Sequence, residues 1–125
     1  MYRLELKIMG LPDTLNARKT HWAAKMLQAR KWKENVVNAI ILGKHPRPES
    51  PLQRAKLVLT RYSSASRPPD FDNLVGSFKN CLDGLKEAGI LIDDNPLIIG
   101  QPEYKWEQTN PKQGHITIVV EEVHD

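Results

Sequence analysis

The chain has 125 residues, the length of one domain, and its 18 Lys and Arg side chains against 15 Asp and Glu give a net charge of +3. It holds one cysteine and no apolar run of membrane-spanning length, which excludes an intramolecular disulfide, a cysteine-rich zinc site and a transmembrane segment. The first residues alternate between charged and apolar, unlike a signal peptide. The composition therefore predicts a single soluble domain over residues 1–125, in a reducing compartment such as the cytoplasm.

The charge is distributed unevenly along the chain. Residues 1–67 carry 14 basic and 4 acidic side chains, a net charge of +10, whereas residues 68–125 carry 4 basic and 11 acidic ones, a net charge of −7. This division predicts that one part of the protein meets a polyanion and another part holds a cation.

Apolar periodicity and turn residues predict four strands and two helices. In the first helix an apolar stripe runs from Trp22 to Ile40, so Trp22 is expected in the core, and Lys33 within the stripe is expected to extend its amine to solvent. The order β-α-β-α-β-β favours an α+β fold, with a small mixed sheet of about four strands packed with two main helices. The expected elements are strands over 2–9, 55–62, 97–108 (kinked at Pro102) and 114–123, and helices within 16–42 and over 72–88.

Two acidic pairs flank the second predicted helix. Asp70 and Asp72 precede it and share one side of an extended backbone, while Asp93 and Asp94 follow it after an apolar segment. If the two pairs converge, their carboxylates suit Mg²⁺, and with a phosphate as a further ligand such an ion is suited to phosphodiester hydrolysis. Taken singly, each pair also has a structural explanation, Asp72 as a helix N-cap and the later pair as a polar turn, and the residues alone leave both explanations open.

Two further side chains near the acidic pairs, Lys79 and Phe71, each have two interpretations. Lys79 faces the same side of the helix as Asp72, where it could neutralise a phosphate, or it could be a solvated lysine paired with Asp83. Phe71 points away from the two aspartates and is either a core residue, which we favour, or a wedge that inserts into a ligand. Cys81 falls on the buried helix face and is expected to be inert.

The acidic segment resembles the RusA-type Holliday junction resolvases, in particular the phage-borne branch. That family has the pattern Asp-x-Asp-Asn-Leu, a helical lysine, Asp-Ala-Leu, and a glycine-bounded apolar segment that ends in Asp-Asp. The residues that carry the resemblance are Asp70-Phe71-Asp72-Asn73-Leu74, Lys79, Asp83-Gly84-Leu85 and Ala88-Gly89-Ile90-Leu91-Ile92-Asp93-Asp94. Weaker similarity in the segments around Leu11-Pro12, His21-Trp22, Trp32-Lys33 and Gly100-Gln101-Pro102 extends it over most of the chain.

The resemblance implies a homodimeric, Mg²⁺-dependent endonuclease that cuts four-way DNA junctions by paired nicks, in recombination and repair, with Mn²⁺ as a possible substitute. Asp70, Asp72 and Asp94 match the catalytic and metal-binding carboxylates of the family, and Asp93 is a further candidate ligand. Lys79 matches the catalytic lysine only if three extra residues are accepted after Leu74 or Val75; without them Gly76 takes its place.

The basic side chains of the first half are the predicted DNA contacts, because Lys and Arg bind phosphates without reading sequence. The alternative is an ordinary solvated surface. Two other functions remain open: a non-catalytic DNA-binding protein of the same fold, and a nuclease for other branched DNA. The predicted DNA-binding residues are Arg18, Lys19, His21, Lys25, Arg30, Lys31, Lys33 and Arg67, with Arg47, Arg54, Lys56 and Arg61 near the second strand.

Overall fold

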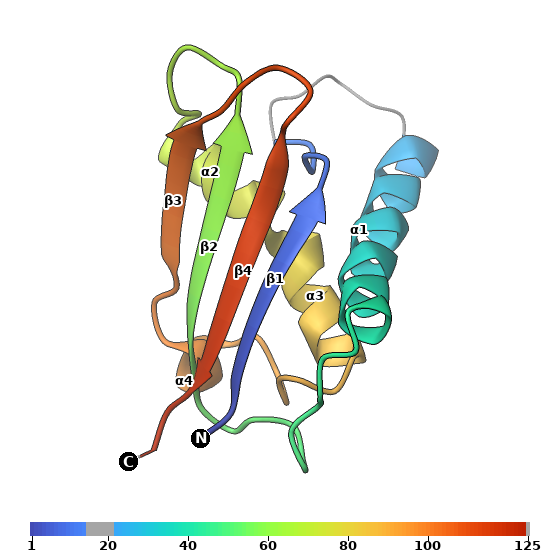
Figure 1. Ribbon diagram of the computed structural model, residues 1–125, viewed down its shortest axis with the longest axis vertical. Helices are drawn as coiled ribbons and strands as arrows, with labels where there is room; N and C mark the ends of the chain where they lie inside the picture. The colour runs from blue at the N-terminus through green and yellow to red at the C-terminus, as the bar shows by residue number, and fades with distance from the viewer. Residues whose placement is uncertain (15–21, 125) are drawn as a thin grey trace.

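The computed structural model describes residues 1–14 and 22–124. Four strands and four helices follow one another along this part of the chain, and their packing is the α+β fold that the sequence predicts (Figure 1). In chain order they are β1 (Arg3–Met9), α1 (Trp22–Leu42), β2 (Ala55–Ser63), α2 (Phe71–Ser77), α3 (Lys79–Glu87), α4 (Pro96–Ile99), β3 (Glu103–Gln108) and β4 (His115–Glu122).

The strands form one mixed sheet in the order β1-β4-β2-β3. The last strand, β4, lies inside the sheet and pairs antiparallel with both β1 and β2, while β2 pairs parallel with β3. Strand β4 is therefore not an edge that could pair with another chain, because both of its sides already carry ladder hydrogen bonds. The edges of the sheet are β1 and β3.

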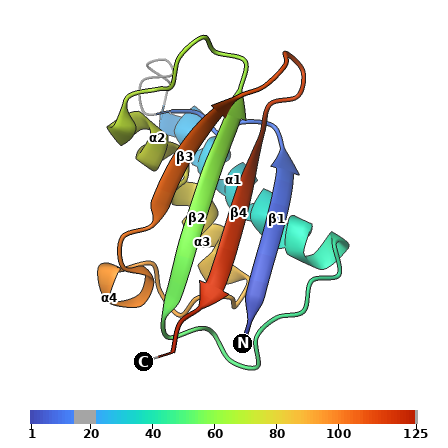
Figure 2. The same ribbon diagram turned by 60° about the vertical axis from the view of Figure 1, so that its left-hand side comes forward.

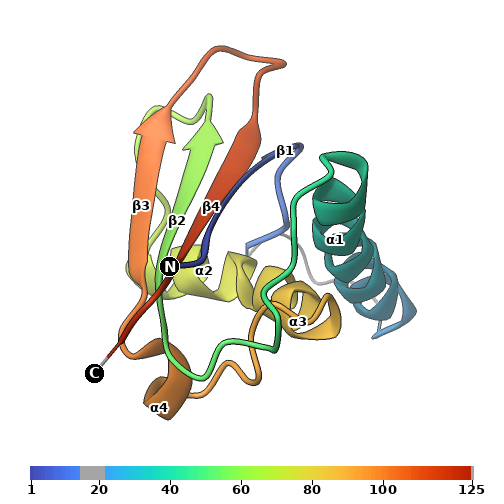
Figure 3. The ribbon, with the colours of Figure 1, turned by 60° about the horizontal axis from the view of Figure 1, so that its bottom comes forward.

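Helices α1, α2 and α3 cover one face of the sheet, and no described element covers the other (Figures 2 and 3). The strands alternate accordingly, with residues such as Leu6, Leu59 and Ile118 buried toward the helices and their neighbours facing outward. Cys81 is fully buried in this core, as expected, and burial raises the pKa of its thiol to about 12.

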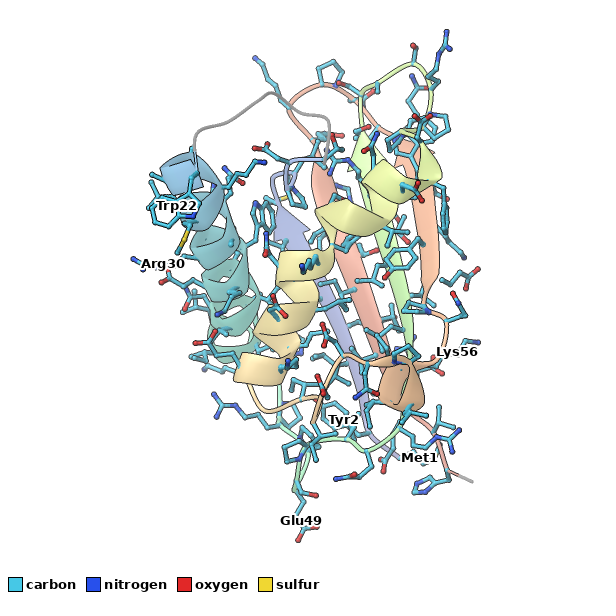
Figure 4. All side chains as sticks on the ribbon, turned by 180° about the vertical axis from the view of Figure 1, so that it is seen from behind. Met1, Tyr2, Trp22, Arg30, Glu49 and Lys56 are labelled. Carbon is cyan, nitrogen blue, oxygen red and sulfur yellow. The ribbon has the colours of Figure 1, made fainter. Side chains whose placement is uncertain are left out.

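Helix α1 turns a different face to the core from the predicted one. Trp22 is 73 % exposed, so the prediction that it is buried is wrong; it and Arg30 project from the outer side of α1 (Figure 4). The core residues of this helix are Trp32, Val36 and Ile40. The predicted stripe was correct at its C-terminal end only, because α1 contacts the sheet and α3 mainly through its second half.

The single helix predicted over 72–88 is divided into α2 and α3 at Phe78. There the backbone N–H of Phe78 bonds to the carbonyl of Val75, three residues back, and its fully buried ring anchors the bend in the core. The strand predicted over 97–108 likewise begins only at Glu103. Asn95 and Pro96 start the short helix α4 instead, since Asn95 caps it by accepting a hydrogen bond from the Leu97 N–H.

Helices α1 and α3 cross closely at Gly84. A Cβ built on Gly84 would lie 2.8 Å from Val36 Cβ and 2.9 Å from the Lys33 carbonyl oxygen. The absence of a side chain here therefore sets the separation of the two helices, and with it the orientation of α3 beneath the sheet.

Candidate metal and nucleic-acid site

The start of α2 presents two aspartates whose side chains have no structural partner among the described residues. Asp70 is the N-cap residue of α2, and Asp72 lies in its first turn; both side chains are exposed. The Asp70 side chain makes no capping hydrogen bond, and within the described residues neither carboxylate forms an ion pair or a side-chain hydrogen bond. The capping explanation of Asp72 is therefore not supported, because Asp70 occupies the cap position and its backbone carbonyl alone accepts from Leu74.

Phe71, between the two aspartates, lies on the surface. It is 64 % exposed, so the prediction that it belongs to the core is wrong. Its ring makes an edge contact with Tyr104 of β3, with centroids 6.2 Å apart, and the same tyrosine ring lies 6.0 Å from that of Phe78. Tyr104 thus fixes the start of α2 against the β3 edge of the sheet.

The turn before α4 uses its acidic residues differently. One Asp93 oxygen accepts a hydrogen bond from the Asp94 N–H at 2.8 Å, and the other accepts from Asn95 Nδ2 at 3.1 Å. Lys86 of α3 reaches both aspartates, with its Nζ 3.2 Å from Asp93 and 3.7 Å from Asp94. The polar-turn explanation therefore holds for Asp93, whereas the Asp94 carboxylate has only the longer contact with Lys86 within the described chain.

These contacts change the protonation equilibria in the same turn. The hydrogen bond from the Asp94 N–H lowers the pKa of Asp93, and the Lys86 ammonium lowers it further. The pKa of Lys86 is raised in turn, first by its hydrogen bond to Asp93. At neutral pH Lys86 and Asp93 are therefore both charged and form an ion pair.

The two acidic turns lie toward opposite ends of β3, because α2 packs near the carboxyl end of that strand and α4 near its start (Figures 1 and 2). Tyr104 lies between them: its ring contacts Phe71, and the pKa of its hydroxyl is raised, chiefly by burial and also by the charge of Asp94. Within residues 1–14 and 22–124, no group of three or more His, Cys, Asp or Glu side chains is arranged to hold a metal ion. Among the described residues, Asp70, Asp72 and Asp94 therefore do not form a closed metal site.

The carboxylates of Asp70 and Asp72 nevertheless suit Mg²⁺ in part. Their carboxylates are hard ligands, no described cation competes for them, and Mg²⁺ is often held by one or two carboxylates that leave positions for water and phosphate. Asp94 does not join this pair in a group arranged for a metal ion within the described residues, and Lys86 competes for its charge. The fit is to a two-carboxylate site completed by a substrate, rather than to a preformed site of three carboxylates.

Lys79 is the first residue of α3 and is exposed. No ion pair joins it to Asp83 or to any other described residue, so the expected pairing with Asp83 does not form. Because the helix is broken at Phe78, Lys79 begins a new segment, and its ammonium is available to an anionic ligand.

The predicted DNA contacts are only partly described. Lys25, Arg30 and Lys31 are exposed along α1, and Arg67 is exposed in the loop that leads to Asp70. Lys33 forms an ion pair with Glu87 at 3.4 Å, which reduces its availability to a phosphate. Arg18, Lys19 and His21 lie outside the described residues.

Arg61 has a structural role that the sequence did not indicate. It points from β2 to the helix side of the sheet, where its Nη1 donates to the Pro12 carbonyl at 2.6 Å. Burial lowers the pKa of this arginine, and the charge of Asp13 partly offsets the effect. Arg61 therefore holds the segment after β1 in place, and the prediction that it contacts DNA loses support.

Two residues of the site were missed by sequence reasoning. Tyr104 faces the helices because of its register opposite Leu59, and Lys86 approaches the Asp93 turn because α3 ends beside it. The alternation of apolar and charged residues in 103–108 could have placed Tyr104 on the inner face. No local signal in the sequence joins Lys86 to Asp93, since their contact depends on the turn between them.

Neither known family models nor curated proteins give a match to this sequence. Among the described helices, none is both long enough and apolar enough to cross a membrane.

Proposed function

We propose that the protein is a Mg²⁺-dependent, RusA-type endodeoxyribonuclease that resolves four-way DNA junctions as a homodimer. The observation that carries this proposal is the exposed pair Asp70 and Asp72, whose carboxylates stabilise no described part of the fold. Two neighbouring carboxylates with no described counter-charge are mutually repulsive, so a bound cation is their simplest use. Their sequence context, Asp-x-Asp-Asn-Leu, is the segment that resembles the resolvase family.

Each group has an assigned role in this proposal. Asp70 and Asp72 would hold the metal ion, which supplies polarisation of the scissile phosphate and acidification of a bound water. Lys79 neutralises charge on the phosphate or on the leaving oxygen. Lys25, Arg30, Lys31 and Arg67 bind backbone phosphates and account for affinity rather than sequence preference.

The test separates binding from cleavage on a synthetic four-way junction with one end-labelled strand. Binding is measured in Ca²⁺ by gel retardation and cleavage in Mg²⁺ or Mn²⁺ on denaturing gels. We expect symmetrical nicks in two opposed strands and a binding constant that falls steeply with salt. Binding without nicks in either metal would contradict the proposed nuclease activity and leave only DNA binding.

A second candidate is a non-catalytic protein that binds branched DNA. It is favoured because no three carboxylates among the described residues are arranged to hold a metal ion, and because Asp94 contacts Lys86. The same assay distinguishes the two. Flap and splayed-arm substrates, run beside the four-way junction, test whether a nuclease activity belongs to other branched structures.

A further inference from the structure

The N-terminal half of α1 leaves large apolar side chains on the surface. Trp22 is 73 % exposed, Leu27 64 % and Met26 50 %. They precede the part of α1 that packs on α3 and the sheet, where the first core residue is Trp32. Apolar side chains that gather on one part of a surface commonly mark a site of interaction.

The charges of the same segment all have one sign. Residues 22–33 carry four basic side chains and no acidic one. At about 100° per residue, Lys25 and Lys31 border the exposed apolar side chains, one on each side of them. A polyanion is therefore the electrostatic complement of this segment.

Arg30 lies among the apolar side chains rather than beside them. At about 100° per residue, it falls between Trp22 and Leu27 around the helix, and Met26 lies next to it. Trp22 and Arg30 project from the same side of α1 (Figure 4). We call Trp22, Met26, Leu27 and Arg30 the α1 platform.

The position of Arg30 selects the kind of ligand. A helix that docks in an apolar groove or lies on a membrane keeps its charges apart from its apolar face. Either partner would strip water from a guanidinium in the middle of that face, which is costly. A nucleic-acid base avoids this cost, because its π face stacks both on an indole ring and on a guanidinium plane.

We propose that the α1 platform binds unpaired bases of a DNA strand, with Trp22 as the main stacking residue. Arg30 stacks on a neighbouring base or contacts its phosphate. Lys25 and Lys31 neutralise the phosphates on either side. The ligand is thus a polyanion with exposed aromatic faces, which a single strand is and a fully paired duplex is not.

A hollow of about 340 Å³ adjoins the platform. It is lined by Met26, Ala29, Arg30, Lys33 and Glu34 of α1 and by Glu87 of α3. Its volume lies within the range of ordinary ligand pockets. Because the two carboxylates in its wall repel a phosphate, the hollow suits a base rather than the DNA backbone.

The fold places the platform at the same end of the sheet as Asp70 and Asp72. Strands β1 and β2 both pair antiparallel with β4, so they run in the same direction. Helix α1 follows β1 and helix α2 follows β2, and both helices start at the carboxyl end of these strands (Figure 1). A strand held on the platform would pass along this end of the sheet to the proposed metal site, a consequence that rests on the proposed function. The binding of unpaired bases does not depend on it.

The first experiment measures binding of a fluorescein-labelled oligothymidylate of about 16 nucleotides by fluorescence anisotropy, in EDTA so that no cleavage occurs. Trp22→Ala should raise the dissociation constant about tenfold, because it removes a stacking face. Trp22→Phe keeps an aromatic face and should retain most of the affinity. Leu42→Ala shortens a side chain that is also exposed, at the other end of the same helix, and should leave the affinity unchanged. Since both side chains are exposed, the melting temperatures should stay close to that of the wild type.

Two further readouts separate stacking from general electrostatic binding. Trp22→Ala should bind a duplex of the same length as well as the wild type does, because paired bases offer no free face. Trp22→Ala should also leave the salt dependence of oligothymidylate binding unchanged. Lys31→Ala should instead reduce the slope of log K against log salt by about 0.7, the value for one phosphate contact on a single strand.

The outcomes distinguish this inference from the proposed function. Equal affinities of Trp22→Ala and wild type for the oligothymidylate would overturn the inference, as would an equal loss of duplex binding. Wild-type binding to phosphatidylglycerol vesicles but not to the oligothymidylate would assign the platform to a membrane surface instead. Stacking on the oligothymidylate without cleavage of a four-way junction would contradict the proposed function alone.

Discussion

The start of α2 and the turn before α4 each carry two acidic residues, and the fold uses them in opposite ways. Asp93 has two hydrogen bonds and a lysine partner, so its charge stabilises the turn in which it lies. Asp70 and Asp72 have none of these contacts among the described residues. Acidic composition alone therefore does not identify a functional site; the absence of a structural use for the charge is the more informative feature.

The largest expected effect comes from Asp72→Asn. The substitution removes a proposed metal ligand but no basic contact and no described interaction of the fold, so cleavage should fall by at least about 100-fold while junction binding and melting temperature stay at wild-type values. Cleavage and gel-retardation assays measure the two activities. Equal loss of binding and cleavage would mean that Asp72 supports the structure instead.

Lys79→Ala should have the next largest effect. Its ammonium is free of ion pairs within the described chain, and we expect cleavage to slow by about tenfold or more with a smaller change in binding. Lys31→Ala, another exposed lysine, is the matched control and should weaken binding without affecting the rate of the bound complex. Wild-type rates in Lys79→Ala would assign the catalytic role to a different basic residue.

Asp93→Ala should reverse the pattern of Asp72→Asn. It removes the acceptor for the Asp94 N–H and for Asn95 and frees Lys86, so the melting temperature should fall. Any activity that remains after correction for the folded fraction should be close to that of the wild type. A stable but inactive Asp93→Ala protein would place Asp93 among the metal ligands and weaken the contrast between the two turns.

The smallest expected effect is a pH dependence. Because the folded state lowers the pKa of Asp93 below its usual value of 3.8, this residue adds stability above that pH, and the contribution is lost as the pH falls through the folded pKa. Melting curves between about pH 5 and 2 should show a steeper loss in the wild type than in Asp93→Asn. High salt should reduce the difference, since the carboxylate is exposed to solvent. Parallel curves for the two proteins would contradict the ion-pair description.

Alternation and turn residues identified most of the fold. Three of the four strands were expected at nearly their observed positions, since Leu4, Leu6, Ile8 and the residues of 116–120 alternate in a way that only one buried face explains. The strand predicted over 97–108 begins only at Glu103. The break at Phe78 was missed because α2 and α3 share a nearly continuous apolar stripe. The exposure of Trp22 and Phe71 was also missed, because an apolar side chain near the end of an element can lie beyond the area that its neighbours cover.

By itself, the sequence determined the α+β class, the buried faces of the strands and the position of both acidic pairs, since these depend on local periodicity and composition. Only the tertiary structure decided that β4 lies inside the sheet, that Lys86 holds Asp93, and that Asp70 and Asp72 have no partner among the described residues. The place of β4 depends on which distant segments meet, and the contact of Lys86 with Asp93 depends on the turn that joins them. Neither leaves a periodic pattern in the sequence.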